Sequence, residues 1–277
     1  MSSIEAIFEV LAGRRVCLLT GAGISTESGI PDYRGPQTRA RPRNPIQHRA
    51  FVESPATRAR YWARSTLGWP RFRAFEPNAG HRAVAAWQAS GQITGLITQN
   101  VDRLHHKAGS PGVIELHGAL FEVRCLACGA LEPRDALQQR ILEGNPEAQR
   151  WAFSLAPDGD ADISEAALSG FEVPGCLHCG GVLKPDVVFF GDNVPPPRVD
   201  EAFAALTAAE ALVVIGSSLA VYSGYRFVLK AAERKVPIVL VNLGESRGDA
   251  QATVRVEAKA GDLLPALVER LAANLKY

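Results

Sequence analysis

The sequence predicts an α/β protein with a Rossmann-like, doubly wound parallel sheet and a smaller zinc-ribbon plus helical domain. Three observations support this fold. Apolar strand-like runs alternate with helical segments, and several of these runs end in glycine or polar residues, as in open parallel sheets. Two Cys-x-x-Cys pairs indicate a zinc ribbon. A basic stretch over 39–73, with a helical segment inside it, indicates a helical module.

Composition places the chain among ordinary globular proteins. It has 277 residues, 47% hydrophobic and 21% charged, which allows one or two domains with a large core. The net charge of +1 argues against a generally nucleic-acid-binding surface. No signal peptide, transit peptide or run of roughly 18 apolar residues is recognisable, so we expect a cytoplasmic protein. In a reducing compartment, paired cysteines favour metal over disulfides.

The expected elements follow from apolar periodicity and turn residues. Strands are predicted at 15–20, 93–98, 113–116, 185–190, 211–215, 237–241 and 252–256, and helices at 4–11, 54–67, 80–90, 199–210, 224–234 and 262–275. We assign 1–37, 85–120 and 185–277 to the Rossmann-like domain. The small domain then consists of the helical module 38–84 and the zinc-ribbon module 121–184.

The first strand runs directly into the glycine-rich turn 21–25. Such a turn lets backbone N–H groups approach a pyrophosphate. The signal is weak alone, because Thr26 replaces the third glycine of the usual fingerprint and no acidic residue follows at the ribose-binding distance. A hydride-transfer dehydrogenase is therefore disfavoured. The loop 29–36 is either a cover over a nucleotide or a plain surface turn.

The stretch 93–118 carries the densest polar chemistry. Its first strand ends in Gln99, Asn100 and Asp102, and a short second strand ends at His117. Carboxyl ends of parallel strands are where α/β enzymes bind ligands, so we expect these side chains to face one cleft. His81, His105 and His106 are interpreted as capping, packing or solvent-facing residues, and Cys17 as inert core.

Four cysteines form two pairs separated by the long insertion 129–175. The pairs are Cys125 with Cys128 and Cys176 with Cys179. Two such knuckles predict a tetrahedral, closed, structural zinc site; redox pairs and an open catalytic zinc are the alternatives. The acidic run that begins at Asp158 does not fit a calcium loop, because Ile163 stands where glycine is required.

The basic stretch 39–73 contains nine arginines and no lysine. A solvated face, a local site for anionic groups and nucleic-acid binding are its three interpretations. Tyr61 and Arg64 lie three residues apart, hence on one helical face, where they could hold a carboxylate.

Together these motifs resemble the sirtuin family of NAD-dependent protein deacylases. The matching segments occur in family order at 21–25, 29–34, 98–102, 117–118, the four cysteines, 184–192 and 216–218. Segments 60–64, 156–160 and 221–227 are similar to the class II branch. With no transit peptide, a bacterial member is indicated.

The resemblance implies that NAD is the co-substrate and one structural Zn²⁺ the metal. It assigns His117 as general base, with Asn100 and Asp102 also catalytic. The implied cofactor-binding residues are Gly21, Ala22, Gly23, Ser25, Pro31, Asp32, Tyr33, Arg34, Gln99, Asn100, Val101, Asp102, His117, Gly216, Ser217, Ser218, Asn242, Leu243, Gly244 and Ala260. The implied substrate-peptide residues are Val188, Phe189, Phe190, Gly191, Ser218, Leu219 and Val221.

The reaction implied by this family converts an acylated protein lysine and NAD into free lysine, nicotinamide and O-acyl-ADP-ribose. The acyl oxygen attacks the ribose carbon as nicotinamide leaves, and His117 then takes a ribose hydroxyl proton, a step that suits an imidazole. Acetyl, long, branched and lipoyl groups are all open, and Tyr61 with Arg64 resembles a pair that reads acidic acyl groups. Alternative functions are protein mono-ADP-ribosyl transfer and non-catalytic NAD binding. No membrane or direct nucleic-acid partner is expected.

Overall fold

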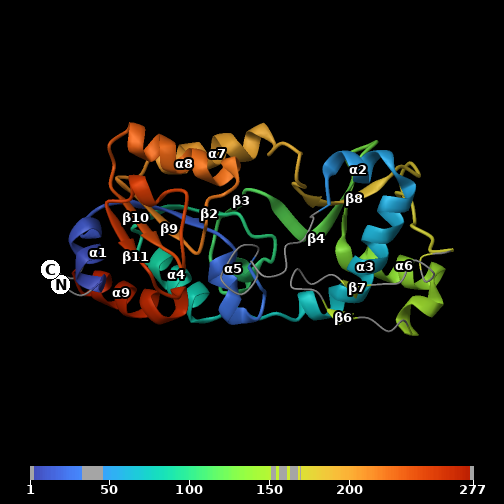
Figure 1. Cartoon of the computed structure of the whole chain (residues 1–277), viewed down its shortest axis with the longest axis horizontal. Helices are drawn as coiled ribbons and strands as arrows, with labels where there is room; N and C mark the ends of the chain where they lie inside the picture. The colour runs from blue at the N-terminus through green and yellow to red at the C-terminus, as the bar shows by residue number, and fades with distance from the viewer. Residues whose placement is uncertain are drawn as a thin grey trace. The chain divides into compact units, whose positions relative to one another are not determined.

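The computed structural model describes residues 3–32, 46–150, 154–155, 161–162, 168 and 170–274. The chain divides into two compact units, each assembled from separate segments. The first unit contains Met1–Arg41, Glu76–Leu116 and Val194–Tyr277, and the second contains Pro42–Phe75 and His117–Asn193. Figure 1 shows the elements of both units coloured along the chain.

The first unit is built on a six-stranded parallel sheet with strand order β11-β10-β9-β1-β2-β3. The strands are β1 (Val16–Thr20), β2 (Ile93–Thr98), β3 (Val113–Glu115), β9 (Ala211–Ile215), β10 (Ile238–Val241) and β11 (Val254–Val256). The strand order reverses at β1, which lies between β2 and β9. The predicted doubly wound sheet is therefore confirmed, and its carboxyl edge at this switch point is the expected place for a ligand.

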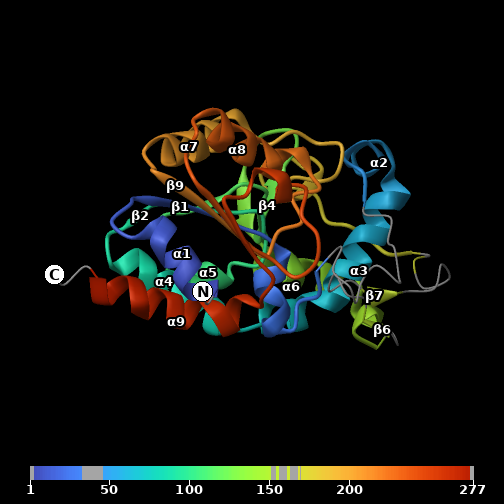
Figure 2. The same cartoon turned by 60° about the vertical axis from the view of Figure 1, so that its left-hand side comes forward.

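The central strands β1, β9 and β10 are almost entirely apolar because both faces of the sheet are covered. In β1, Val16 and Leu18 join one core cluster, whereas Cys17 and Leu19 join the other. The first cluster takes apolar residues from α1 (Ser3–Leu11), α4 (Ala79–Ala89) and α9 (Ala260–Asn274). The second takes them from α7 (Pro196–Thr207) and α8 (Tyr222–Glu233), which lie together on the opposite face (Figure 2). Burial raises the pKa of Cys17 to about 12, so its thiol is unreactive, as predicted.

The second unit contains a three-stranded antiparallel sheet with order β5-β4-β8. Its strands are β4 (Gly118–Cys125), β5 (Leu131–Pro133) and β8 (Leu183–Val187). The strand predicted at 185–190 thus begins and ends earlier. The unit also contains α2 (His48–Glu53), α3 (Pro55–Arg73), α6 (Arg134–Gly144), the short helix η2 (Pro146–Arg150) and the paired strands β6 (Ser154–Leu155) and β7 (Ala161–Asp162).

Helix α3 starts one residue after the predicted start, since Ser54 is its N-cap, and it continues six residues past the predicted end. At its start, Ser54 Oγ accepts a hydrogen bond from the Thr57 amide and Pro55 occupies the first turn. At its end, the buried residues Trp69 and Phe72 pack on Phe121. This aromatic packing keeps the chain helical even though Pro70 lies inside the helix.

Helix α6 is attached to α3 through a buried guanidinium. The Arg134 Cζ atom lies 5.3 Å from the Trp62 ring centroid and 5.1 Å from that of Trp69. Burial lowers the pKa of Arg134 to about 10. Within the described ranges, no helix has both the length and the apolar character needed to cross a membrane.

Candidate active site

Two turns at the carboxyl edge of the parallel sheet pack backbone against backbone. After β1, the chain enters the 3₁₀ helix η1 (Ala22–Ser28); after β9, it turns at Gly216 with φ +61°. The Gly21 amide donates to the Ile215 carbonyl at 3.0 Å. A Cβ on Gly21 would lie 2.8 Å from the Gly216 carbonyl oxygen. Glycine is therefore required here for close packing of the turns as well as for any approach of a ligand.

The missing third glycine of the fingerprint has a local explanation. The Thr26 hydroxyl donates to the Gly23 carbonyl at 2.9 Å and closes the first turn of η1. The threonine thus satisfies a backbone group inside the turn, and the departure from the dinucleotide fingerprint is compatible with a tight turn at this edge.

Ser25, Asn100 and Asp102 meet at the ends of β1 and β2. The Ser25 hydroxyl donates to Asp102 Oδ2 at 2.7 Å, and Asn100 Nδ2 donates to Ser25 Oγ at 3.1 Å. Asn100 Nδ2 also donates to the Gly21 carbonyl at 3.1 Å. Both amide hydrogens of Asn100 are therefore used within the protein, and its carbonyl Oδ1 is the group of this side chain that a ligand N–H can reach as an acceptor.

The Asp102 carboxyl is buried, which raises its pKa above the ordinary value; the hydrogen bond from Ser25 acts in the opposite direction. Its second oxygen, Oδ1, accepts from the Leu104 amide at 2.9 Å and starts α5 (Leu104–Lys107). One carboxyl group therefore fixes both the serine hydroxyl and the following helical turn.

His81 reaches this cluster from the first turn of α4. Its Nε2 lies 3.4 Å from Ser25 Oγ, and its Nδ1 accepts a 3.4 Å bond from the Asn78 amide. Asn78 Oδ1 in turn accepts from the His81 amide, which completes a capping box. The expected capping role is confirmed, but the contact with Ser25 was not predicted. The asparagine three residues before the histidine signals the capping box, whereas Ser25 is 56 residues away and no local pattern signals that contact.

His105 is also buried, so the interpretation as a packing residue applies to it and not to the exposed His106. His105 Nε2 lies 3.0 Å from Thr20 Oγ1, which lies 2.9 Å from Thr98 Oγ1. Thr98 Oγ1 also accepts from the Asn100 amide at 3.1 Å. Burial lowers the pKa of His105 well below its ordinary value. This chain of bonds holds the backbone at the start of the 99–102 segment.

Gln99 links the ends of β2 and β9. Its Nε2 donates to Ser217 Oγ at 2.9 Å, and Ser217 Oγ accepts from the Leu219 amide at 3.2 Å. A Cβ on Gly224 in α8 would lie 2.4 Å from Gln99 Oε1, so glycine makes room for this side chain. Leu219 itself has φ +53°, an uncommon value for a non-glycine residue.

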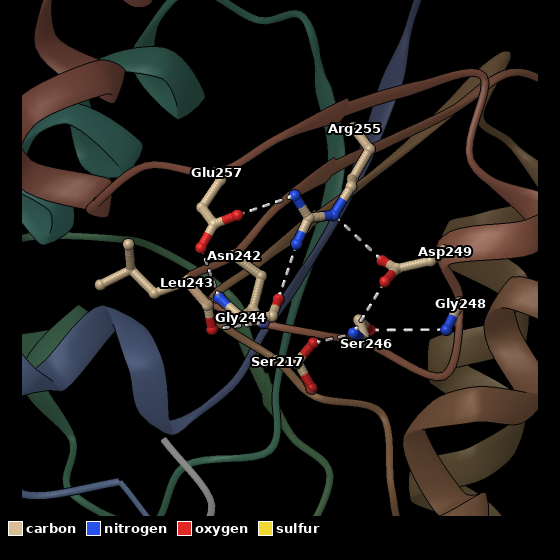
Figure 3. A network of polar contacts seen from close by, with 9 residues as sticks. All are labelled: Ser217, Asn242, Leu243, Gly244, Ser246, Gly248, Asp249, Arg255 and Glu257. Carbon is tan, nitrogen blue, oxygen red and sulfur yellow. Dashed lines mark hydrogen bonds and ion pairs between the residues drawn. The ribbon is translucent and has the colours of Figure 1, made fainter. Parts of the chain in front are cut away.

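Asn242 follows β10, and a polar network holds the loop beyond it (Figure 3). Asn242 Nδ2 donates to the carbonyls of Leu243 and Gly244 at 3.0 and 3.1 Å. Arg255 donates to the Gly244 carbonyl at 2.8 Å and pairs with both Asp249 and Glu257. Glu257 follows Arg255 by two residues at the end of β11, whereas Gly244 and Asp249 come from the preceding loop. No local pattern in the sequence reveals the contacts with that loop.

The other predicted cofactor residues of the first unit lie in the same segments. Pro31, Asp32, Val101 and Ser218 are half-buried, Leu243 is exposed, and Ala260 is buried at the start of α9. Tyr33 and Arg34 lie outside the described residues.

His117 belongs to the second unit. The predicted peptide residues are divided: Val188, Phe189, Phe190 and Gly191 lie in the second unit, and Ser218, Leu219 and Val221 lie in the first. The His117 carbonyl accepts from the Val188 amide at 2.9 Å, next to the β4–β8 pairing of Gly118 with Val187. Phe189 is buried among aromatic rings, 5.3 Å from Phe51 and 5.4 Å from Tyr61 between centroids. Phe190 and Gly191 are exposed; Gly191 has φ +79°.

Tyr61 and Arg64 are both half-buried on α3. The Tyr61 ring makes edge contacts with Phe51, Trp62 and Phe189. Its role in acyl selection stays a prediction.

The four cysteines converge as the spacing predicted, with their sulfur atoms all within 4.8 Å of one another. The two knuckles are built alike. Gly129 N–H donates to the Cys125 carbonyl at 3.0 Å, and Gly180 N–H donates to the Cys176 carbonyl at 2.8 Å; both glycines have positive φ. The pKa of Cys125 is lowered to about 6 because the backbone N–H groups of Cys128 and Ala127 donate to its sulfur. The Gly181 backbone N–H acts to lower the pKa of Cys179, but side-chain hydrogen bonds with Cys128 and Cys125 raise it to about 12. The fit to a tetrahedral Zn²⁺ therefore rests on the four sulfur ligands lying this close together.

The sequence model of the Sir2 family matches residues 21–223. The chain belongs to the Sir2 family. The matched range begins at the first turn, includes Asn100, Asp102, His117 and the four cysteines, and ends just after the second turn. Of the residues in Figure 3, Ser217 lies inside the matched range, and Asn242 and the others lie beyond it.

Sir2-family relatives cover nearly the whole chain. The human NAD-dependent protein lipoamidase sirtuin-4, mitochondrial, is 49% identical over 92% of this chain and 82% of its own length. NAD-dependent protein deacetylase 1 of Streptomyces coelicolor is 49% identical over 98% of this chain and 90% of its own. Among solved structures, a Sir2–p53 peptide–NAD⁺ complex has a TM-score of 0.74 at 29% identity and covers 98% of both chains.

Proposed function

We propose that this Sir2-family chain is an NAD-dependent protein-lysine deacylase, which transfers the acyl group of a modified lysine to ADP-ribose and releases nicotinamide. The observation that carries the proposal is the cluster of Ser25, Asn100 and Asp102 at the ends of β1 and β2. The names of its relatives support it, since these are NAD-dependent protein deacetylases and a lipoamidase.

NAD is the co-substrate. When bound, it supplies an electrophilic ribose carbon whose leaving group is a neutral base. We assign its phosphates to the turns at 21–25 and 216–218, and its adenosine half to Asn242, Leu243 and Gly244. The carboxamide of the nicotinamide matches the cluster chemically. Asn100 Oδ1 accepts from a carboxamide N–H, and the Asp102 carboxyl offers a second polar partner in a region where burial strengthens such bonds.

We assign His117 the general base. A neutral imidazole at physiological pH takes a proton from a ribose hydroxyl, so that the hydroxyl oxygen can attack the carbon of the acyl group. We assign the backbone at 188–191 of the second unit, and separately that at 218–221 of the first unit, to binding of an extended substrate peptide. The exposed Phe190 and Gly191, which follow the last strand of the small sheet, support this assignment.

Which acyl group the enzyme removes is a more specific part of the proposal. The names of two relatives, a lipoamidase and a deacetylase, favour lipoyl and acetyl groups as the first candidates. Tyr61 and Arg64 keep an acidic acyl group on the list of candidates, because a guanidinium beside a phenol can bind a carboxylate.

The decisive experiment is a panel of acetyl-, lipoyl-, methylglutaryl-, succinyl- and long-chain acyl-lysine peptides, each with and without NAD, analysed by mass spectrometry. We expect NAD-dependent loss of at least one acyl group together with O-acyl-ADP-ribose. His117→Ala should abolish turnover without changing the thermal unfolding midpoint by more than a few degrees. Full turnover by that variant would refute the mechanism. Addition of ADP-ribose to the target, without loss of acyl, would favour the transferase alternative.

A further inference from the structure

One helix cap is connected to the nicotinamide-assigned cluster through a single imidazole. Asn78 caps α4, and its amide donates to Nδ1 of His81 at 3.4 Å. Across the ring, His81 Nε2 lies 3.4 Å from Ser25 Oγ. The two ring nitrogens therefore face different partners, one a backbone donor and the other a hydroxyl.

The Asn78 amide decides which nitrogen of His81 carries the proton. A backbone N–H can only donate, so Nδ1 must be the acceptor and the neutral ring must be protonated at Nε2. The imidazole is fully buried, and burial, followed by the charge of Arg82, lowers its pKa to about 4. The ring is therefore neutral at physiological pH, and its Nε2–H points towards Ser25.

The proton of Ser25 is fixed as a consequence. A hydroxyl oxygen has two lone pairs and one hydrogen. Asn100 Nδ2–H and His81 Nε2–H are both donors to Ser25 Oγ, so they occupy the lone pairs. The remaining hydrogen then points at Asp102 Oδ2, 2.7 Å away. This arrangement leaves the Ser25 hydroxyl with one orientation.

We propose that His81 is a positioning residue, which sets the direction of the Ser25 hydroxyl and through it the arrangement of Asn100 and Asp102 that receives nicotinamide. The inference rests on the proposed function for the identity of the ligand. The donor and acceptor assignments along the chain Asn78–His81–Ser25–Asp102 do not depend on which ligand binds. Loss of the Nε2 donor would leave a lone pair of Ser25 without a partner and allow its hydroxyl to rotate away from Asp102.

Two substitutions separate this role from helix capping. In His81→Asn, the amide oxygen can take the place of Nδ1 and keep the bond from Asn78, but the side chain is too short to reach Ser25. In His81→Gln, the amide nitrogen can take the place of Nε2 and donate to Ser25. His106→Gln, at an exposed histidine, is the matched control.

The measurement is the dissociation constant of nicotinamide by NMR titration, which needs no turnover, together with KM for NAD, kcat and the unfolding midpoint. We expect His81→Asn to weaken nicotinamide about tenfold, as for loss of one buried hydrogen bond, and His81→Gln to recover most of that loss. His106→Gln should match the wild type. Equal nicotinamide affinities of the two His81 variants, or tighter binding by the asparagine variant, would overturn the proposal.

A second observable tests the proton assignment directly. Nitrogen-15 imidazole shifts of the wild type should show His81 neutral and protonated at Nε2 at pH 7; the other tautomer, or a cation, would overturn it. If the wild type binds nicotinamide but no acyl peptide is processed, the proposed deacylation fails while the positioning role remains testable by affinity.

Discussion

Gly23 and Gly216 hold the two turns of the nucleotide-assigned edge in direct backbone contact. The Gly23 amide donates to the Gly216 carbonyl at 2.8 Å, and a Cβ on Gly23 would lie 2.7 Å from Gly216 Cα. The two strands that end there, β1 and β9, are neighbours in the sheet. The position of one turn therefore determines that of the other.

Gly23→Ala is expected to lower the free energy of unfolding by about 1–3 kcal/mol, because backbone atoms must move to admit the methyl group. It should also weaken NAD binding. Gly144→Ala is the control, since a Cβ there meets nothing within 4 Å, and its stability should be unchanged or slightly raised. Urea unfolding and NAD titration measure both effects. Equal stabilities of the two variants would show that the turns can separate without cost.

Asp102→Asn should change how stability depends on pH. The folded-state pKa of Asp102 lies above its unfolded value, so the native state keeps a proton that the unfolded chain has already lost. Wild-type stability should therefore fall as pH rises from about 4 through the folded pKa, by at most roughly 1.4 kcal/mol per pH unit from this group.

The asparagine variant lacks this titration. Its stability relative to wild type should rise over the same pH window, while nicotinamide binding weakens because Ser25 loses its acceptor. Urea unfolding at several pH values gives the comparison. A difference between the two proteins that is constant with pH would contradict the raised pKa.

His105→Phe should make the protein less sensitive to acid. The folded-state pKa of His105 lies well below the unfolded value of about 6.5, so only the unfolded chain gains this proton as pH falls. The contribution of His105 to the free energy of unfolding is fully present above about pH 6.5. It decreases as the pH falls below that value, by roughly 1.4 kcal/mol per pH unit.

The phenylalanine variant is expected to be less stable at pH 7, where it lacks the bond to Thr20, and to lose less stability between pH 6.5 and 5. His106→Phe serves as the control at an exposed position. Identical acid slopes in the wild type and the His105 variant would rule out a buried neutral imidazole.

Removal of the metal should unfold the ribbon. Chelation, or Cys125→Ser, removes the bonds that join the two knuckles, and the small sheet has little core of its own to replace them. We expect one zinc per wild-type chain, its loss in the variant, and rapid proteolysis within the 121–184 segment. Cys17→Ala, far from the ribbon in sequence and buried in the sheet, should retain one zinc. Full zinc content after Cys125→Ser would refute the site.

The sequence predicted the parallel sheet and the cysteine cluster because both leave strong local signals. Strands such as 211–215 are continuous apolar runs, and the Cys-x-x-Cys-Gly turns have a fixed shape. The end of α3 was wrong because Trp69 and Phe72 obtain their packing from Phe121, which is remote in sequence. Likewise, the contact of His81 with Ser25 and that of Arg255 with Gly244 join different segments. Periodicity reveals which face of an element is apolar, but it does not reveal which polar groups are brought together by the fold.

The pairing of β1 with β9 has a consequence for biosynthesis. The Arg15 amide at the foot of β1 bonds to Glu210, 195 residues later. One neighbour of the central strand is thus synthesised only after every residue of the second unit, and β10, β11 and α9 follow later still. Until then β1 has an unsatisfied edge of apolar residues, which a nascent chain must keep from other strands. We therefore expect the chain to depend on chaperones during its synthesis. A circular permutant that begins at β9 should refold without them.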